Sequence, residues 1–214
     1  MDEDFIAISE STRNEKVKNF FINNKKFLIS ILLTIILLVV GYFVYDEYKD
    51  NKKKKIADQF NLSSIEFILG KNENIESEMI EIIESKNKTY SPLALYFLLD
   101  NNIIDSKEKI NRLFDIIIND TNLDKEIKNL NIYKKALYNS DSGSENNLLK
   151  ILKPLINSES IWKSHALYLL AEFFYSKNEK QKSKEFFEKI LKLENGNPSI
   201  KKEAQKRIQR DFSE

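Results

Sequence analysis

The stretch KKFLISILLTIILLVVGYFVYDEYKDNKKKK, Lys25–Lys55, governs the interpretation of the whole chain. Its 19 residues from Phe27 to Tyr45 carry no charge and lie between two lysines and a lysine-rich segment. At a rise of about 1.5 Å per residue, a helix of this length nearly spans the roughly 30 Å hydrocarbon core of a bilayer. A core helix of a soluble domain would carry a polar face, whereas Ser30 and Thr34 are the only polar side chains here other than tyrosines. The stretch predicts a transmembrane helix at 27–45.

The anchor is expected to remain in the protein and not to be cleaved as a signal peptide. A signal peptide has a short basic start, a shorter apolar run and small residues at the cleavage site. Here 26 residues precede the apolar run, which ends in the bulky Tyr42–Tyr45. Aromatic residues near both ends suit the headgroup regions. The residues that represent the anchor along its length are Phe27, Leu32, Ile36, Val40 and Tyr45.

The flanking charges favour a cytoplasmic N-terminus, although their totals do not. Five basic residues lie within fifteen positions of the anchor on each side. Lys25 and Lys26 directly precede the anchor, whereas Asp46 and Glu47 directly follow it, which favours a cytoplasmic segment at 1–26 and an external domain. The run Lys52–Lys55 fits a translocated flank less well; it contacts outer-leaflet headgroups or forms the solvated face of a helix.

The composition argues against catalysis, cofactors and nucleic acid. The chain has no cysteine and one histidine, which removes thiol nucleophiles, zinc–cysteine sites and His-rich metal sites. A net charge of +1 with no basic cluster gives no reason to expect nucleic acid. No phosphate-binding loop or Ser/His/Asp set is present. We predict a non-enzyme with no cofactor, metal or small-molecule substrate. His165 is expected to be a packed ring and Trp162 to cover the end of the core.

Residues 46–214 predict an all-α domain of helical hairpins. The chain has only four glycines and three prolines, and no run shows the alternation of a strand. A juxtamembrane helix at 46–70 is expected to continue from the anchor, with Gly70 as its stop and with apolar side chains that recur at helical spacing. Those side chains are Ile56, Phe60, Ile65 and Ile68.

The segment 71–214 is predicted to contain several further helices. PLALYFLLDN, from Pro92, is apolar almost all round and is expected to be buried. Pro154 is expected to kink or end its helix. Helix starts are predicted at Ser91 before Pro92, Asp105 with Glu108, Asn178 with Gln181, and Asn197 before Pro198.

Near the C-terminus, two predicted helices match the tetratricopeptide spacing. Large and aromatic residues alternate there with small ones, in the order large-x2-large-small-x2-aromatic and then small-x3-aromatic. The small residues let the two helices approach closely, and the large ones fill the groove between them. The residues at these packing positions are Leu167, Leu170, Ala171, Phe174, Ser183 and Phe187. One convincing repeat predicts a tetratricopeptide-like domain and not a long solenoid.

The order of segments resembles a bacterial family described as the ancillary SecYEG translocon subunit, most closely its alphaproteobacterial members. An acidic start, DEDFIAISESTRNEK at 2–16, precedes the anchor. A Tyr-x2-Leu-Ala helix at 90–94 and a Leu-x-Pro-Leu passage at 152–155, followed by Trp162, come later. The resemblance covers nearly the whole chain. The chain departs from the family in its shortage of glycine and alanine, and in Asn195, which stands where the repeat has proline.

The resemblance implies an inner-membrane protein with a periplasmic helical domain. It implies partners in the SecYEG translocon and in periplasmic chaperones that receive emerging chains, and it offers no catalytic residue. A cell-envelope or cell-division scaffold of the same topology is the alternative, because that branch shares the domain type. A cytoplasm-facing scaffold is a third. An exposed apolar stripe along the concave face of the domain would favour binding of peptides or partner helices.

Overall fold

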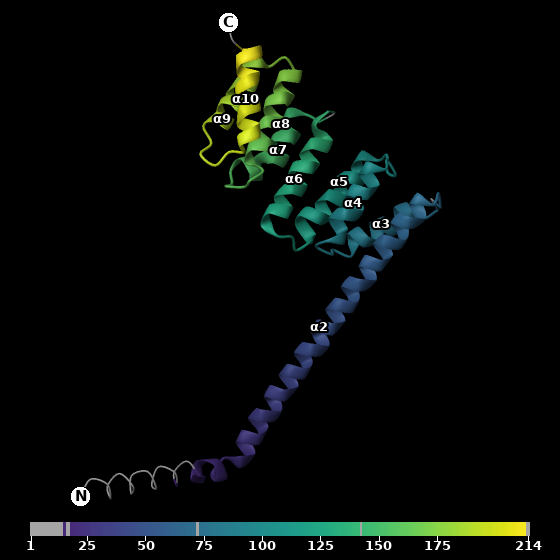
Figure 1. Ribbon diagram of the computed structural model, residues 1–214, viewed down its shortest axis with the longest axis vertical. Helices are drawn as coiled ribbons and strands as arrows, with labels where there is room; N and C mark the ends of the chain where they lie inside the picture. The colour runs from purple at the N-terminus through teal and green to yellow at the C-terminus, as the bar shows by residue number, and fades with distance from the viewer. Residues whose placement is uncertain (1–14, 16–17, 72, 142, 213–214) are drawn as a thin grey trace, which may run out of the picture. The chain divides into compact units, whose positions relative to one another are not determined.

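A computed structural model describes residues 15, 18–71, 73–141 and 143–212. Every regular element in these ranges is a helix, and the helices after the first form successive hairpins, which confirms the all-α expectation (Figure 1). The elements are α2 (Lys25–Ile68), α3 (Ile75–Glu84), α4 (Tyr90–Asp100), α5 (Lys107–Asp115), the π-helical turn η1 (Ile116–Asp120), α6 (Lys125–Ser140), α7 (Glu145–Ile156), α8 (Lys163–Ser176), α9 (Lys180–Leu191) and α10 (Pro198–Asp211).

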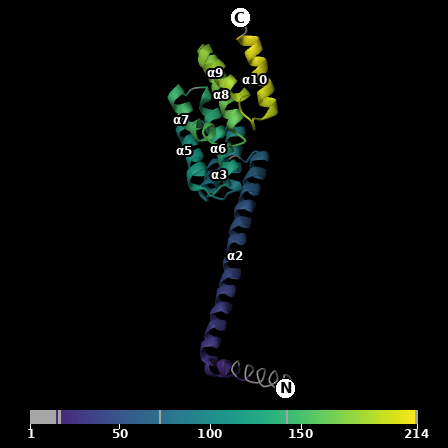
Figure 2. The ribbon, with the colours of Figure 1, turned by 90° about the vertical axis from the view of Figure 1, so that its left-hand side faces the viewer.

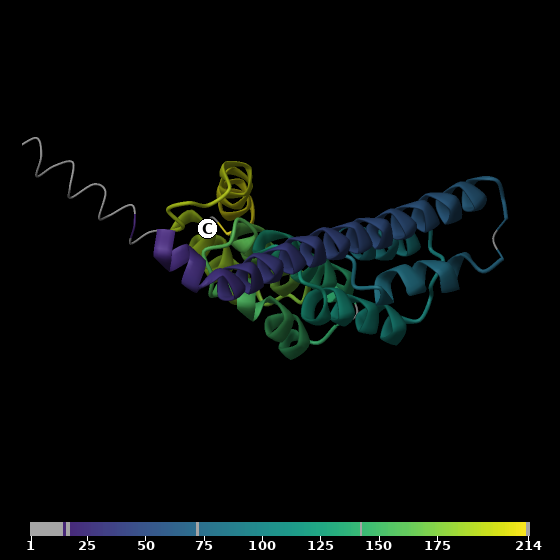
Figure 3. The same ribbon diagram turned by 90° about the horizontal axis from the view of Figure 1, so that it is seen from below.

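The chain divides into two compact units, one up to Lys55 and one from Ile56 onward. α2 is a single unbroken helix whose residues contribute to both units (Figure 3). In the second unit α3 packs on α4, α6 on α7, α8 on α9, and α9 on α10. The last three helices lie side by side in two perpendicular views (Figures 1 and 2).

The final turns of α2 form the first layer of the second unit. The rings of Phe60 and Phe67 have their centroids 6.3 and 5.3 Å from that of Phe97 on α4. Between them, the hydroxyl of Ser63 donates a 2.5 Å hydrogen bond to the carboxylate of Glu78 on α3. One face of α2 is therefore fixed by both apolar and polar contacts.

The opposite face of these turns remains exposed. Ile65 and Ile68 lie on α2 as the helical spacing predicted, but both side chains are more than half exposed, as are Leu62 and Leu69. We call these four residues the α2 stripe. The helix carries two apolar faces here, and periodicity alone does not distinguish the one that packs.

Gly70 ends α2 as predicted. Its φ of +76° lies in the left-handed region, which glycine enters without steric cost. Its N–H donates to the carbonyl of Phe67, and the next N–H, from Lys71, donates to that of Glu66. This pair of bonds is a Schellman motif, which satisfies two of the carbonyls left free at a helix end.

Among the predicted helix starts, only Asn197 caps its helix as expected. Its side-chain oxygen accepts from the N–H groups of Ser199 and Ile200. Ser91 instead lies inside α4, buried, and its hydroxyl donates to the carbonyl of Ile82 on α3. Asn87, three residues earlier than α4, accepts from the N–H groups at the helix start. Ser91 was predicted as a helix cap from its neighbours in sequence, but its hydroxyl instead makes a hydrogen bond between two helices.

The residues at the other two start signals, Asp105 and Asn178, do not cap the helices predicted to begin there. The cap of α5 is Ser106 and not Asp105, since the Ser106 hydroxyl accepts from the N–H of Lys109. Asn178 ends α8 and does not start α9. It is left-handed, with φ +61°, and the N–H of the following Glu179 reaches back to the carbonyl of Phe174. Asparagine suits both roles, so its type alone does not decide between them.

Two irregular features lie in the middle of the second unit. Pro154 is inside α7, which continues for two residues beyond it. α5 runs directly into η1, and the hydroxyl of Thr121 donates to the Ile116 carbonyl of that turn. The start signal at Asp105 with Glu108 predicted a helix here, and no glycine or proline in 107–120 indicates that its hydrogen-bond spacing changes at η1.

Two apolar cores stabilise the unit. The larger extends from the end of α2 to α8, and the smaller joins α8, α9 and α10. Buried members of the smaller core are Leu167, Ala171, Phe187, Ile190 and Ala204.

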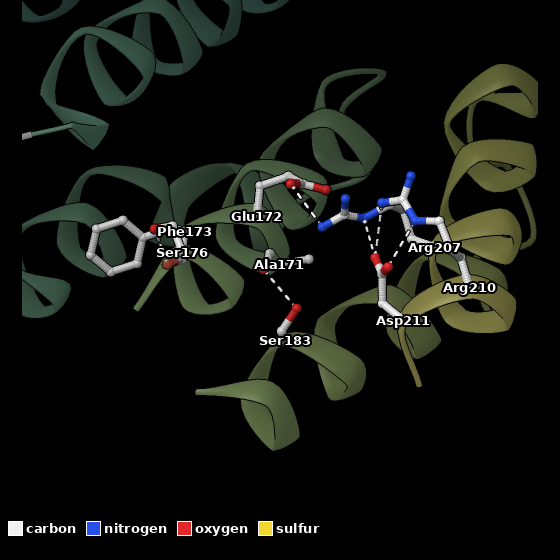
Figure 4. Close-up of polar contacts among 8 residues, drawn as sticks. All are labelled: Ala171, Glu172, Phe173, Ser176, Ser183, Arg207, Arg210 and Asp211. Atoms are coloured by element: carbon white, nitrogen blue, oxygen red, sulfur yellow. Dashed lines mark hydrogen bonds and ion pairs between the residues drawn. The ribbon is translucent and has the colours of Figure 1, made fainter. Parts of the chain in front are cut away.

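A charged cluster joins α10 to α8 beside the smaller core (Figure 4). Arg207 lies 3.1 Å from a carboxylate oxygen of Glu172 on α8 and 3.1 Å from one of Asp211. Its side chain is only 13% exposed, and its guanidinium lies 4.5 Å from the ring centroid of Tyr175. Arg210 donates to Asp211 as well, which lowers the pKa of that carboxyl. These contacts hold the last helix on the domain.

Candidate functional site

The predicted repeat positions lie at the contact between α8 and α9. All six side chains are at most 2% exposed: Leu167, Leu170, Ala171, Phe174, Ser183 and Phe187. The hydroxyl of Ser183 donates a 2.8 Å hydrogen bond to the Ala171 carbonyl, which joins the two helices where they cross (Figure 4). These residues are packing groups. Because they are buried, they cannot contact a partner, and a binding surface is expected among exposed side chains.

The anchor positions all lie on α2 with exposed side chains: Phe27, Leu32, Ile36, Val40 and Tyr45. Within the described ranges, α2 is the one helix long and apolar enough to cross a membrane. An exposed run of this length on a helix is unfavourable in water, because each large apolar side chain exposed there forgoes roughly 1.5–3 kcal/mol of burial. This supports a single-pass membrane protein and leaves its orientation open.

The candidate binding site is a groove between α4 and the start of α6. It encloses about 340 Å³ and is lined mainly by apolar side chains. Leu93 and Ile127, from opposite walls, are 41% and 43% exposed although they are large and apolar. Its other apolar lining residues are Pro92, Tyr96, Leu123 and Leu130. We call this the α4–α6 groove.

Tyr96 is held firmly in the wall of the α4–α6 groove. Its hydroxyl donates a 2.8 Å hydrogen bond to the side-chain oxygen of Asn131, whose own NH₂ donates to the Ile127 carbonyl. The ammonium of Lys134 lies 3.6 Å from the ring centroid, a cation–π contact. Burial raises the pKa of Tyr96 to about 12. The ring thus forms a rigid part of the groove and does not turn into solvent.

The groove carries opposite charges among its lining residues. Lys88, just before α4, and Asp124, just before α6, both contribute to the lining. The apolar walls can take apolar side chains of a peptide or helix, and the two charges can fix its direction. The arrangement offers a shaped, mainly apolar surface with one charged group of each sign.

A larger but more polar groove lies between α5–η1, α6 and α7. It encloses about 530 Å³. Asn111 and Asn139 face each other across it and exchange two amide hydrogen bonds of 3.2 and 2.8 Å. Lys135 lies 2.6 Å from Asp115. These polar groups already satisfy one another, so this groove offers a ligand fewer free partners than its size suggests.

The two aromatic residues singled out in the sequence meet in one cluster. The ring of Trp162 stacks on Tyr133 of α6 with centroids 5.8 Å apart, and His165 lies 5.1 Å from Trp162. All three are half-buried. Burial lowers the pKa of His165, which favours a neutral ring. No group of three His, Asp or Glu side chains suited to a metal occurs in the described part of the chain.

Comparison of the chain with protein-family models, with curated proteins and with solved structures finds no match. The resemblance to ancillary translocon subunits therefore remains a hypothesis that depends on the order of its motifs.

Sequence reasoning did not predict the α4–α6 groove. The segment from Pro92 was expected to be buried because it is apolar all round, yet Leu93 is exposed. A helix that short cannot bury its entire surface in a two-layer domain, so an apolar residue on its outer side was a usable signal. Ile127 gave no signal, because a lone apolar residue on a helix surface is common.

Proposed function

We propose that this protein is a membrane-anchored adaptor whose helical domain binds an apolar segment of a partner protein. The observation that carries this proposal is the α4–α6 groove, where Leu93 and Ile127 stay exposed on facing walls. Contiguous exposed apolar surface on a domain is unfavourable unless a partner covers it.

The groove suits a short helix or extended segment that presents a few large apolar side chains. A volume of about 340 Å³ is at the lower end of the range for small-ligand pockets, so only part of a partner would enter it. Apolar burial contributes roughly 25 cal/mol per Å², and a site this small gives modest affinity by itself. Such affinity suits a factor that holds partners briefly and is itself held in place by a membrane anchor.

We propose that the partners belong to protein export: the SecYEG translocon in the bilayer and periplasmic chaperones beside it. The supports are the apolar run of α2, the charges next to it, and the resemblance in segment order. In this proposal residues 1–26 lie in the cytoplasm, α2 crosses the inner membrane, and the domain from Ile56 faces the periplasm.

The first test is binding at the groove, through the variant Ile127→Lys in the full-length protein. We expect cross-linking to translocon subunits or periplasmic chaperones in native membranes to fall about tenfold, the loss that 1.4 kcal/mol produces. The reason is that a lysine charge would have to be buried against an apolar ligand. Quantitative mass spectrometry of the cross-linked partners measures the effect.

Leu137→Lys is the matched control. Leu137 also lies on α6 and is 49% exposed, but it is not part of the groove. Its cross-linking should stay within about twofold of the parent, as expected for a surface change away from the interface. Equal losses in both variants, or cross-links only to envelope or division proteins, would reject the export adaptor. Circular dichroism checks that both variants fold.

The second test is the side of the membrane on which the domain lies. A single cysteine at Asn146 is expected to react with an impermeant maleimide in intact spheroplasts, because the proposal places it in the periplasm. Asn146 is exposed and lies on the first turn of α7. Ser144, two residues earlier, is less suitable, since its hydroxyl caps α7 by accepting from the N–H of Asn147. The chain has no other cysteine to interfere.

A cysteine at Lys18, before the anchor, is the control and should react only after lysis. If Asn146→Cys reacts only after lysis while Lys18→Cys reacts without it, the topology is inverted and the periplasmic assignment is wrong.

A further inference from the structure

We infer that the α2 stripe is a self-association surface, along which two copies of this chain pair in parallel. The stripe consists of Leu62, Ile65, Ile68 and Leu69, all more than half exposed. It is separate from the α4–α6 groove, and the inference rests on the proposed function only for the membrane anchor.

The geometry of the stripe is that of a helix-pairing seam. Leu62, Ile65 and Leu69 are spaced three and four residues apart, so they form one line along the helix. The line lies opposite the face of Phe60 and Phe67, which packs on Phe97 of α4. The domain therefore cannot cover the stripe without releasing the face that it already holds.

A second copy is the occupant that best fits this pattern. A line of leucine and isoleucine at alternating three- and four-residue spacing matches the a and d positions of a two-stranded coiled coil. In a two-fold pair the same patch serves on both chains, so each Ile65 would meet its counterpart at the same level. A partner of different shape would not need this spacing.

The size of the stripe also favours a partner that is anchored beside it. A stable interface buries roughly 800 Å² on each partner, and four side chains over two helical turns supply well under that. Such a patch would not hold a freely diffusing protein. Two copies with the same anchor in one bilayer are confined to its plane, which raises their effective concentration and excludes antiparallel pairing.

One charge limits the strength of the pairing. Asp58 precedes Leu62 by four residues and Ile65 by seven, and it is exposed on the same line. In a parallel pair the two Asp58 carboxylates would lie opposite each other and repel. The association is therefore reversible, and replacing Asp58 with leucine should strengthen it by extending the apolar seam.

The test uses the full-length chain with a single cysteine, reconstituted at low density in vesicles of phosphatidylethanolamine and phosphatidylglycerol. We expect oxidation of Ile65→Cys to give a disulfide-linked dimer, and Glu66→Cys to give about tenfold less, because cysteines with Cα atoms beyond roughly 7 Å cannot be bridged without backbone movement. Glu66 is adjacent in sequence but lies about 100° around the helix. Random collisions in the bilayer would affect both variants alike.

Two further variants complete the test. Adding Asp58→Leu to Ile65→Cys should increase the dimer yield, and adding Leu62→Lys should lower it toward that of Glu66→Cys. Equal yields from Ile65→Cys and Glu66→Cys would overturn the inference, as would a dimer insensitive to both additions. So would a cross-link from Ile65→Cys to another protein, with no homodimer, in native membranes. Flotation of the vesicles reports membrane insertion separately, so failure of the anchor and failure of pairing are distinguishable.

Discussion

Replacing Phe187 with alanine should lower the free energy of unfolding by about 3–5 kcal/mol, the usual cost of removing a buried phenylalanine side chain. Phe187 is fully buried in the smaller core, with ring centroids 5.5 Å from Tyr168 on α8 and 6.1 Å from Phe212. Its removal leaves a cavity among three helices, and the guanidinium of Arg207 loses the ring that lies 5.6 Å from it. Urea unfolding of the full-length protein in detergent, followed by circular dichroism, measures the change.

The control is the same change at the adjacent position, Phe186→Ala. Phe186 is only half-buried, although it stacks on Phe174 with centroids 5.4 Å apart. Phe186→Ala should lower the free energy of unfolding by only about 1–2 kcal/mol, because less of the Phe186 side chain is removed from water on folding. If the two variants lose equal stability, then the contact of α9 with α8 and α10 differs from the one described above.

Arg207→Met should release α10 from the domain while the remaining helices stay folded. The change keeps an apolar side chain of similar length but leaves the carboxylate of Glu172 without its cation. Removing one partner of a fully buried ion pair lowers stability by about 3–5 kcal/mol. We expect the free energy of opening α10 to fall by about 2–3 kcal/mol, because the Glu172 side chain is 36% exposed. Hydrogen exchange of the α10 amides measures it, and a loss of about two orders of magnitude in protection is expected at 1.4 kcal/mol per tenfold change.

Lys206→Met controls for the loss of a positive charge on the same helix. Lys206 pairs with Glu203 at 3.5 Å, and both side chains are well exposed. Exposed pairs of this kind contribute roughly 0–1 kcal/mol, so α10 should keep its protection. Similar losses in both variants would mean that net charge, and not the cluster around Arg207, holds the helix.

The sequence predicts the helical architecture well because its signals are local. A long uncharged run, rare glycine and proline, and apolar spacing near 3.6 residues are enough to place the helices. Gly70 and Asn197 act as predicted because each role depends on a few neighbouring backbone groups. Ser91 was assigned wrongly because its partner, the Ile82 carbonyl, belongs to another helix. η1 was missed because nothing in its residues opposes an α-helix.

The candidate site was harder to predict than the fold, because exposure is a property of the assembled domain. Leu93 and Ile127 lie 34 residues apart in the sequence and on different helices, and only packing brings them to one groove. The α2 stripe shows the same limit in another way. Ile65 and Phe67 are equally apolar, and the domain packs on the second alone.

The fluorescence of Trp162, which stacks on Tyr133, can report on the folded state of the protein. Trp162 is the only tryptophan of the chain, so its emission comes from one place, the junction of α6 and α8. The spectrum is thus free of overlapping contributions, and a change in its wavelength reports water reaching that single ring. The α6–α8 junction can be followed in membranes of native composition, without a dye and without a substitution.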